Sequence, residues 1–140
     1  MANTSLNTLP IYTASGDTQW YGGATAANTT KDGSSGTIYN VFTAGSNGGY
    51  VQRIRFKSLG TNVATVARVF INNGSANTTA TNNTYWDDIS LPATTVSETS
   101  AQPTFELPLN IALPAGYKIF VTLGTAVAAG YTITVIGGKY

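Results

Sequence analysis

A period of two along residues 50–71 constrains the fold of this chain more than any other feature. In the first half, Arg53, Arg55 and Lys57 alternate with Ile54 and Phe56, and residues 63–71 alternate in the same way. Alternation over two runs with a Gly60-Thr61-Asn62 break predicts two strands joined as a hairpin. Because residues 63–71 are apolar on both faces, we expect the second strand in the interior of a two-layer β structure. On a regular strand, Tyr50 would share the face of Ile54, and Val51 the face of the basic residues.

The rest of the chain reads as short strands separated by turns. Pro108 cannot donate a backbone hydrogen bond, so it predicts that its strand is an edge strand or contains a bulge. No segment shows the 3.6-residue apolar period of a helix. This pattern predicts an all-β fold: an extended N-terminal arm at 1–16, then a single-domain antiparallel β-sandwich at 17–140, a jelly roll of about eight strands. The further strands are expected at 17–21, 37–43, 84–91, 94–100, 103–113, 117–123 and 131–136.

The surface of the protein must be polar but poorly charged. Charged residues make up only 9% of the 140 residues, against roughly 25% in an ordinary soluble domain. Thr, Asn, Ser and Gly must supply the rest, which favours a protein packed in an assembly, or else an extracellular β domain with a neutral surface. The net charge of +1 does not indicate the strongly basic surface that nucleic-acid binding requires. No apolar run is long enough to predict a membrane span.

Few conventional catalytic groups are available. The chain has no histidine and no cysteine, which excludes a Ser-His-Asp triad, a thiolate nucleophile and metal sites built from these ligands. A carboxylate pair remains, but Asp87 and Asp88 are adjacent, so in a regular strand they point to opposite faces. Glu98 and Glu106 could meet across neighbouring strands, but the sequence gives no evidence that they do. We therefore expect no catalytic residues, no metal, no cofactor and no enzymatic activity.

Two aromatic pairs are candidates for stacking on a sugar ring. One lies next to the Asp87-Asp88 carboxylates, which could bind sugar hydroxyls or Ca²⁺, although the loop motif of a strong calcium site is missing. The alternative is that the aromatic residues are core or interface residues and that the two aspartates cap a strand end. The candidate glycan-binding residues are Trp20, Tyr21, Tyr85 and Trp86.

Arg53, Arg55 and Lys57, which we call the basic stripe, follow one face of one strand and include three of the seven basic residues. They form either a solvated face partnered by carboxylates on adjacent strands, or a surface that docks on an acidic partner through bidentate arginine contacts. Three charges without interleaved aromatic residues are too few for nucleic acid.

The N-terminal arm contains one short apolar segment around Pro10, made of Leu9, Ile11 and Tyr12. Proline permits an edge strand or an extended arm there but not a central strand. The segment is either a frayed terminus or an arm that contacts a neighbouring subunit. With the basic stripe, its three apolar residues are the candidate partner-binding residues.

Three segments together resemble the jelly-roll cement or decoration proteins of tailed bacteriophage capsids. They are VQRIRFKSLGTNVATVARVFINNGS at 51–75, LPLNIALPAGYKIFVTLGT at 107–125 and AAGYTITVIGG at 128–138. The resemblance implies a structural protein that forms a homotrimer and binds the major capsid protein. It would be made in the host cytoplasm and reside on the capsid surface of the virion. The resemblance transfers no site residues. The alternative is a carbohydrate- or receptor-binding head or tip domain of a tail fibre or spike.

Overall fold

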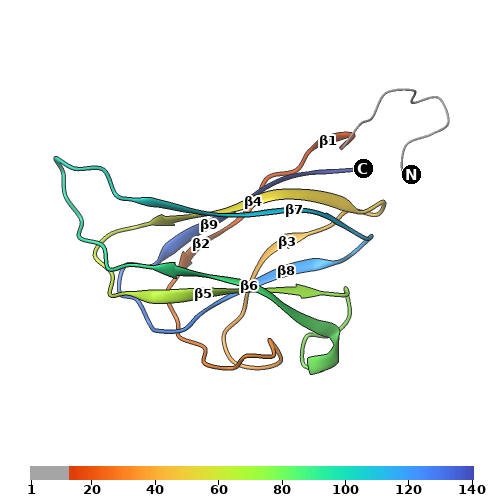
Figure 1. Cartoon of the computed structure of the whole chain (residues 1–140), viewed down its shortest axis with the longest axis horizontal. Helices are drawn as coiled ribbons and strands as arrows, with labels where there is room; N and C mark the ends of the chain where they lie inside the picture. The colour runs from red at the N-terminus through yellow and green to blue at the C-terminus, as the bar shows by residue number, and fades with distance from the viewer. Residues whose placement is uncertain (1–12) are drawn as a thin grey trace.

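A computed structural model gives the structure of the protein and describes residues 13–140, as two antiparallel sheets packed face to face (Figure 1). Sheet A contains β1 (Ser15–Gly16), β2 (Gln19–Ala24), β4 (Gly49–Ser58), β7 (Thr104–Leu113) and β9 (Tyr131–Lys139). Sheet B contains β3 (Tyr39–Thr43), β5 (Thr65–Asn72), β6 (Asn83–Leu91) and β8 (Lys118–Leu123), and one 3₁₀ turn, η1 (Ala80–Asn82), precedes β6. The predicted all-β sandwich is confirmed. Residues 13–140 contain no helix long and apolar enough to cross a membrane.

The chain changes sheet at almost every connection. Sheet A has the order β2–β9–β4–β7, with β1 pairing beside β2 on the same side of β9, and sheet B has the order β3–β8–β5–β6. Within the described residues, only β5 and β6 are both consecutive and hydrogen-bonded to each other. The predicted hairpin over residues 50–71 is therefore wrong, because β4 lies in sheet A and β5 in sheet B. Alternation shows that each strand buries one face, but it does not distinguish edge-to-edge pairing from packing across a core.

A bulge in β4 changes the predicted assignment of its faces. The register against both β7 and β9 shifts between Val51 and Arg53. Val51 is consequently buried beside Ile54 and Phe56, whereas Tyr50 lies on the outer face, which reverses the prediction for both residues. A bulge adds one residue to a strand and so reverses the alternation beyond it.

The predicted strand at 94–100 is absent from the structure. Thr94 forms only an isolated bridge with Asn62, and residues 95–103 are irregular. The Thr94 side chain is 4% exposed and bonds to Ser58 and Gly60 within the connection from β4 to β5. These polar contacts take the place of a strand ladder.

The core lies between the two sheets and is built from side chains of all the long strands. It includes Phe56 of β4, Val69 of β5, Ile119 of β8 and Ile133 of β9. Phe70 is also completely buried but does not belong to this cluster. It lies on the outer face of sheet B, where its backbone pairs with those of Phe120 and Tyr85.

Residues 25–38, which we call the covering loop, pack over the outer face of sheet B (Figure 1). Arg68 Nη1 donates to the carbonyl oxygen of Asn28 at 3.0 Å, and Asn83 Nδ2 donates to that of Asp32 at 3.1 Å. Gly33 lies against the ring of Phe70, where an added Cβ would be 3.2 Å from a ring carbon. The loop thus covers the buried ring of Phe70 on the outer face of sheet B.

Candidate binding face

The outer face of sheet A, which we call the docking face, has no counterpart of the covering loop among residues 13–140, and its outward side chains on β4 and β7 are exposed or half-buried. A row of four residues crosses it from strand to strand: Trp20 pairs with Thr134, Thr134 with Arg55, and Arg55 with Glu106. Directly paired residues point to the same side of a sheet, so β2, β9, β4 and β7 present these side chains together. Trp20 is 68% exposed, far more than a core tryptophan would be.

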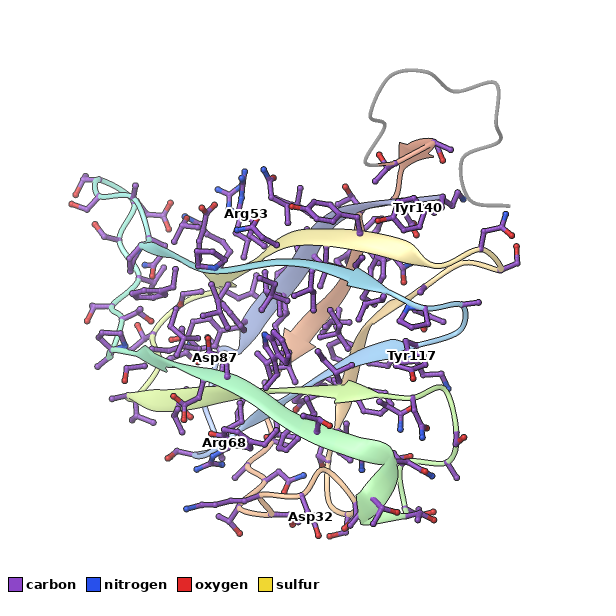
Figure 2. All side chains as sticks on the ribbon, turned by 45° about the vertical axis from the view of Figure 1, so that its right-hand side comes forward. Asp32, Arg53, Arg68, Asp87, Tyr117 and Tyr140 are labelled. Carbon is purple, nitrogen blue, oxygen red and sulfur yellow. The ribbon has the colours of Figure 1, made fainter. Side chains whose placement is uncertain are left out.

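The basic stripe lies along this face, at right angles to the row. Arg53, Arg55 and Lys57 all project from the outer side of β4, and Figure 2 shows Arg53 pointing away from the sandwich. Arg68 and Asp32 lie on the opposite side of the molecule, with sheet B (Figure 2).

The three cations of the stripe have different surroundings. Arg53 Nε lies 3.5 Å from Glu106 Oε1, and its Nη1 donates to Gln52 Oε1 at 3.1 Å. Lys57 Nζ donates to the carbonyl oxygen of Gln102. Arg55 is exposed, and no residue from 13 to 140 forms a hydrogen bond or ion pair with its guanidinium. The carboxylate partner expected from an adjacent strand is therefore present for Arg53 and not for Arg55 within residues 13–140, and docking on an acidic partner stays a prediction.

A hollow of about 370 Å³ adjoins the stripe on the docking face. It is lined by Thr13, Tyr50, Gln52, Ile136 and Gly137. The bulge in β4 turns Tyr50 and Gln52 outward, and Gly137 of β9 lies close against the backbone of Tyr50 and Val51. Sequence analysis missed this hollow, although a Gly137-Gly138 pair inside a strand pattern is a signal for a bulge or a close backbone approach.

The four candidate glycan residues do not form one surface. Trp20 belongs to the docking face, whereas its neighbour Tyr21 pairs with the buried Ile133 and packs its ring 4.7 Å from that of Tyr39. Tyr85 and Trp86 lie on β6, the edge strand of sheet B. The four predicted glycan-binding residues are thus distributed over different parts of the sandwich.

A bulge at Trp86 brings Tyr85 and Asp88 to the same face. The register of β6 against β5 shifts between Tyr85 and Asp87, and the Tyr85 hydroxyl donates to Asp88 Oδ2 at 2.6 Å. Burial raises the pKa of Tyr85, and the bond to Asp88 and its negative charge raise this pKa further.

Asp87 and Asp88 point to opposite faces, as predicted, since they pair with Val69 and Arg68 respectively. Asp87 is exposed on β6, the edge strand of sheet B, next to which Figure 2 labels it. Residues 13–140 contain no cluster of three acidic side chains suited to holding a metal ion. Leu9, Ile11 and Tyr12 lie outside the described residues.

Comparison of the chain with models of protein families, with curated proteins and with solved structures finds no match in any of the three.

Proposed function

We propose that the protein is a structural virion protein, a cement or decoration subunit that binds and stabilises a phage head. Its partner is the major capsid protein, it acts as a homotrimer on the capsid surface, and it has no catalytic role. The observation that carries the proposal is the difference between the two outer faces. One is covered by the chain itself, and the other exposes a cationic stripe in a protein with very few charges.

The strand order supports the jelly-roll form of the sandwich that the proposal implies. Four strands in the order β2–β9–β4–β7 face four in the order β3–β8–β5–β6, and the chain alternates between the sheets. Two interlocked Greek keys in facing sheets give this kind of alternation.

The charge of the docking face fits an acidic partner surface. Three cations and the single carboxylate of Glu106 leave an excess of two positive charges along β4 and β7. A hydrogen bond between Arg55 and a partner carboxylate would be charge-assisted and worth about 1.5–3 kcal/mol. A standard interface of roughly 800 Å² per partner, multiplied by three copies, then gives tight binding through avidity.

Reversing the stripe tests this proposal. Co-sedimentation with heads assembled without the protein should show strong binding for the natural chain and loss of binding for the Arg53→Glu, Arg55→Glu double variant. The control is Lys31→Glu with Lys118→Glu, which changes the net charge equally on the side of sheet B. Equal loss in both variants would indicate a general charge effect, and unchanged binding in both would contradict docking through this face.

A carbohydrate- or receptor-binding tip domain is the second candidate, and the exposure of Trp20 favours it. A tryptophan ring with a free face stacks on the apolar face of a sugar, and its burial on binding is energetically large. Quenching or a blue shift of Trp20 fluorescence on titration with oligosaccharides would support this candidate. An unchanged spectrum in both the natural chain and Trp86→Phe would count against it.

A further inference from the structure

We infer that the docking face contains a binding site for an acidic saccharide, a sugar chain with carboxylate groups. The site combines the hollow beside Gln52 and Ile136 with the ring of Trp20 and the guanidinium of Arg55. This inference rests on the second of the two functions proposed above and is independent of the first.

The strand register places these groups within reach of one short saccharide. Trp20 pairs with Thr134, and Ile136 lies two residues farther along β9 on the same face. Such diagonal neighbours are about 7–8 Å apart. Arg55 is two strands away from Trp20, at roughly 10 Å for strands spaced by about 4.8 Å. A sugar stacked on Trp20 could therefore extend a neighbouring unit into the hollow and its carboxylate toward Arg55.

Hydrogen-bonding groups surround the hollow in a fixed arrangement. Arg53 donates to Gln52 Oε1 at 3.1 Å, which leaves the amide N–H groups of Gln52 able to donate to a ligand. The Tyr50 hydroxyl donates to Asn110 Oδ1 at 3.2 Å, which holds the ring at the wall of the hollow. Amides and hydroxyls that flank an aromatic ring match the alternating polar edges and apolar faces of a sugar.

The charges favour an acidic sugar over a neutral one. Glu106 faces Arg53 at 3.5 Å, whereas Arg55 has no such partner in residues 13–140. Arginine binds a carboxylate through two parallel hydrogen bonds, which gives both orientation and affinity.

The size of the hollow favours a saccharide over a protein loop. A volume of about 370 Å³ lies within the range of roughly 300–1,000 Å³ typical of small-molecule sites. A protein partner would instead use a large flat area. Both could use the same face, and the experiment separates them.

Calorimetric titration with trigalacturonate and with its methyl ester tests the site on the full chain. The acid should bind, and the ester should bind about tenfold more weakly because it lacks the charge. Trp20→Ala should weaken binding of both ligands, whereas Arg55→Gln should weaken only that of the acid. Trp86→Ala and Lys31→Gln are the matched controls and should bind as the natural chain does. All four positions are exposed, so thermal unfolding should show intact folding.

The alternative outcomes can be told apart. Equal binding of acid and ester that is lost in Trp20→Ala would retain the carbohydrate-binding function and overturn the acidic site. Absence of binding to either ligand, with weaker head binding by Arg55→Gln, would overturn the saccharide site and leave the capsid proposal standing. Binding that depends on Trp86 instead of Trp20 would place the site on β6 and also overturn this inference.

Discussion

The side-chain amide of Asn62 and the backbone N–H and C=O of Gly130 form two hydrogen bonds with each other. Asn62 Nδ2 donates to the Gly130 carbonyl oxygen, and the Gly130 N–H donates to Asn62 Oδ1, both at 3.0 Å. The remaining capacity of the amide is filled by Ser58 Oγ and the Ala129 N–H. Asn62 is 3% exposed, so this network ties the crossing from sheet A to sheet B to the start of β9.

We predict that Asn62→Ala lowers the free energy of unfolding by about 3 kcal/mol. The substitution leaves the N–H groups of Ala129 and Gly130 buried without their acceptor, at about 1–3 kcal/mol for each unsatisfied group. Urea unfolding measures the change. Asn73→Ala, at an exposed position, should change the free energy by less than about 0.5 kcal/mol. Similar values for the two variants would show that the network does not stabilise the crossing.

The stability of the covering loop should depend on Phe70 more than the stability of the sandwich does. Phe70→Ala removes the ring against which Gly33 packs, at a cost of about 3–5 kcal/mol for a buried phenylalanine. Because Phe70 lies outside the main core, we expect the loop to open locally before the sheets separate. Tryptic cleavage after the exposed Lys31 should become faster than in the natural chain. Cleavage after Lys31 at the natural rate would argue that the loop is held by its hydrogen bonds alone.

Glycine is required at position 137 and not at position 22. A methyl group on Gly137 would overlap the carbonyl oxygen of Tyr50, whereas one on Gly22 would meet no atom within 4 Å. Gly137→Ala should therefore lower the free energy of unfolding by about 1–3 kcal/mol, the usual range for overpacking. Gly22→Ala should have little effect on the thermal midpoint. If the midpoints of both variants match that of the natural chain, β9 can shift away from β4 at low cost.

Tyr85 should ionise at higher pH than an ordinary tyrosine. Its folded pKa is raised above 10.0, first by burial and then by Asp88. The hydroxyl contact therefore contributes stability at pH values below 10.0, which is lost as the pH rises through the folded pKa. Asp88→Asn should lower the pKa of Tyr85 without restoring the ordinary value, because burial remains. An NMR titration of the Tyr85 ring checks this, and a pKa unchanged by Asp88→Asn would assign the whole shift to burial.

The fold class could be predicted from the sequence because several strands show the period of two, as β4 does from Arg53 to Ser58. β7 and β8 were located to within one or two residues, and Pro108 does lie on an edge strand. The sheet membership of β4 and β5 could not be predicted in this way. It follows from pairing with strands far away in the sequence, and the crossing between β4 and β5 is held by contacts of Asn62 with the equally distant Ala129 and Gly130.

The parts of the docking face were predictable to different degrees. The spacing of Arg53, Arg55 and Lys57 was enough to place them on one face, because no bulge interrupts β4 after Arg53. Trp20 could not be assigned to the same face, since this depends on the pairing of β2 with β9 and of β9 with β4. The hollow depends on a bulge, and a bulge leaves only a weak signal in the sequence.

The covering loop gives the molecule a front and a back. A copy that is bound through Arg55 and its neighbours would present Lys31 and the Asp32–Ser34 turn to the solvent. A short peptide inserted after Ser34 would then be displayed outward, on the side opposite to the attachment surface. If the protein binds through the docking face, the covering loop would thus be a site for attaching peptides to the surface to which the protein is bound.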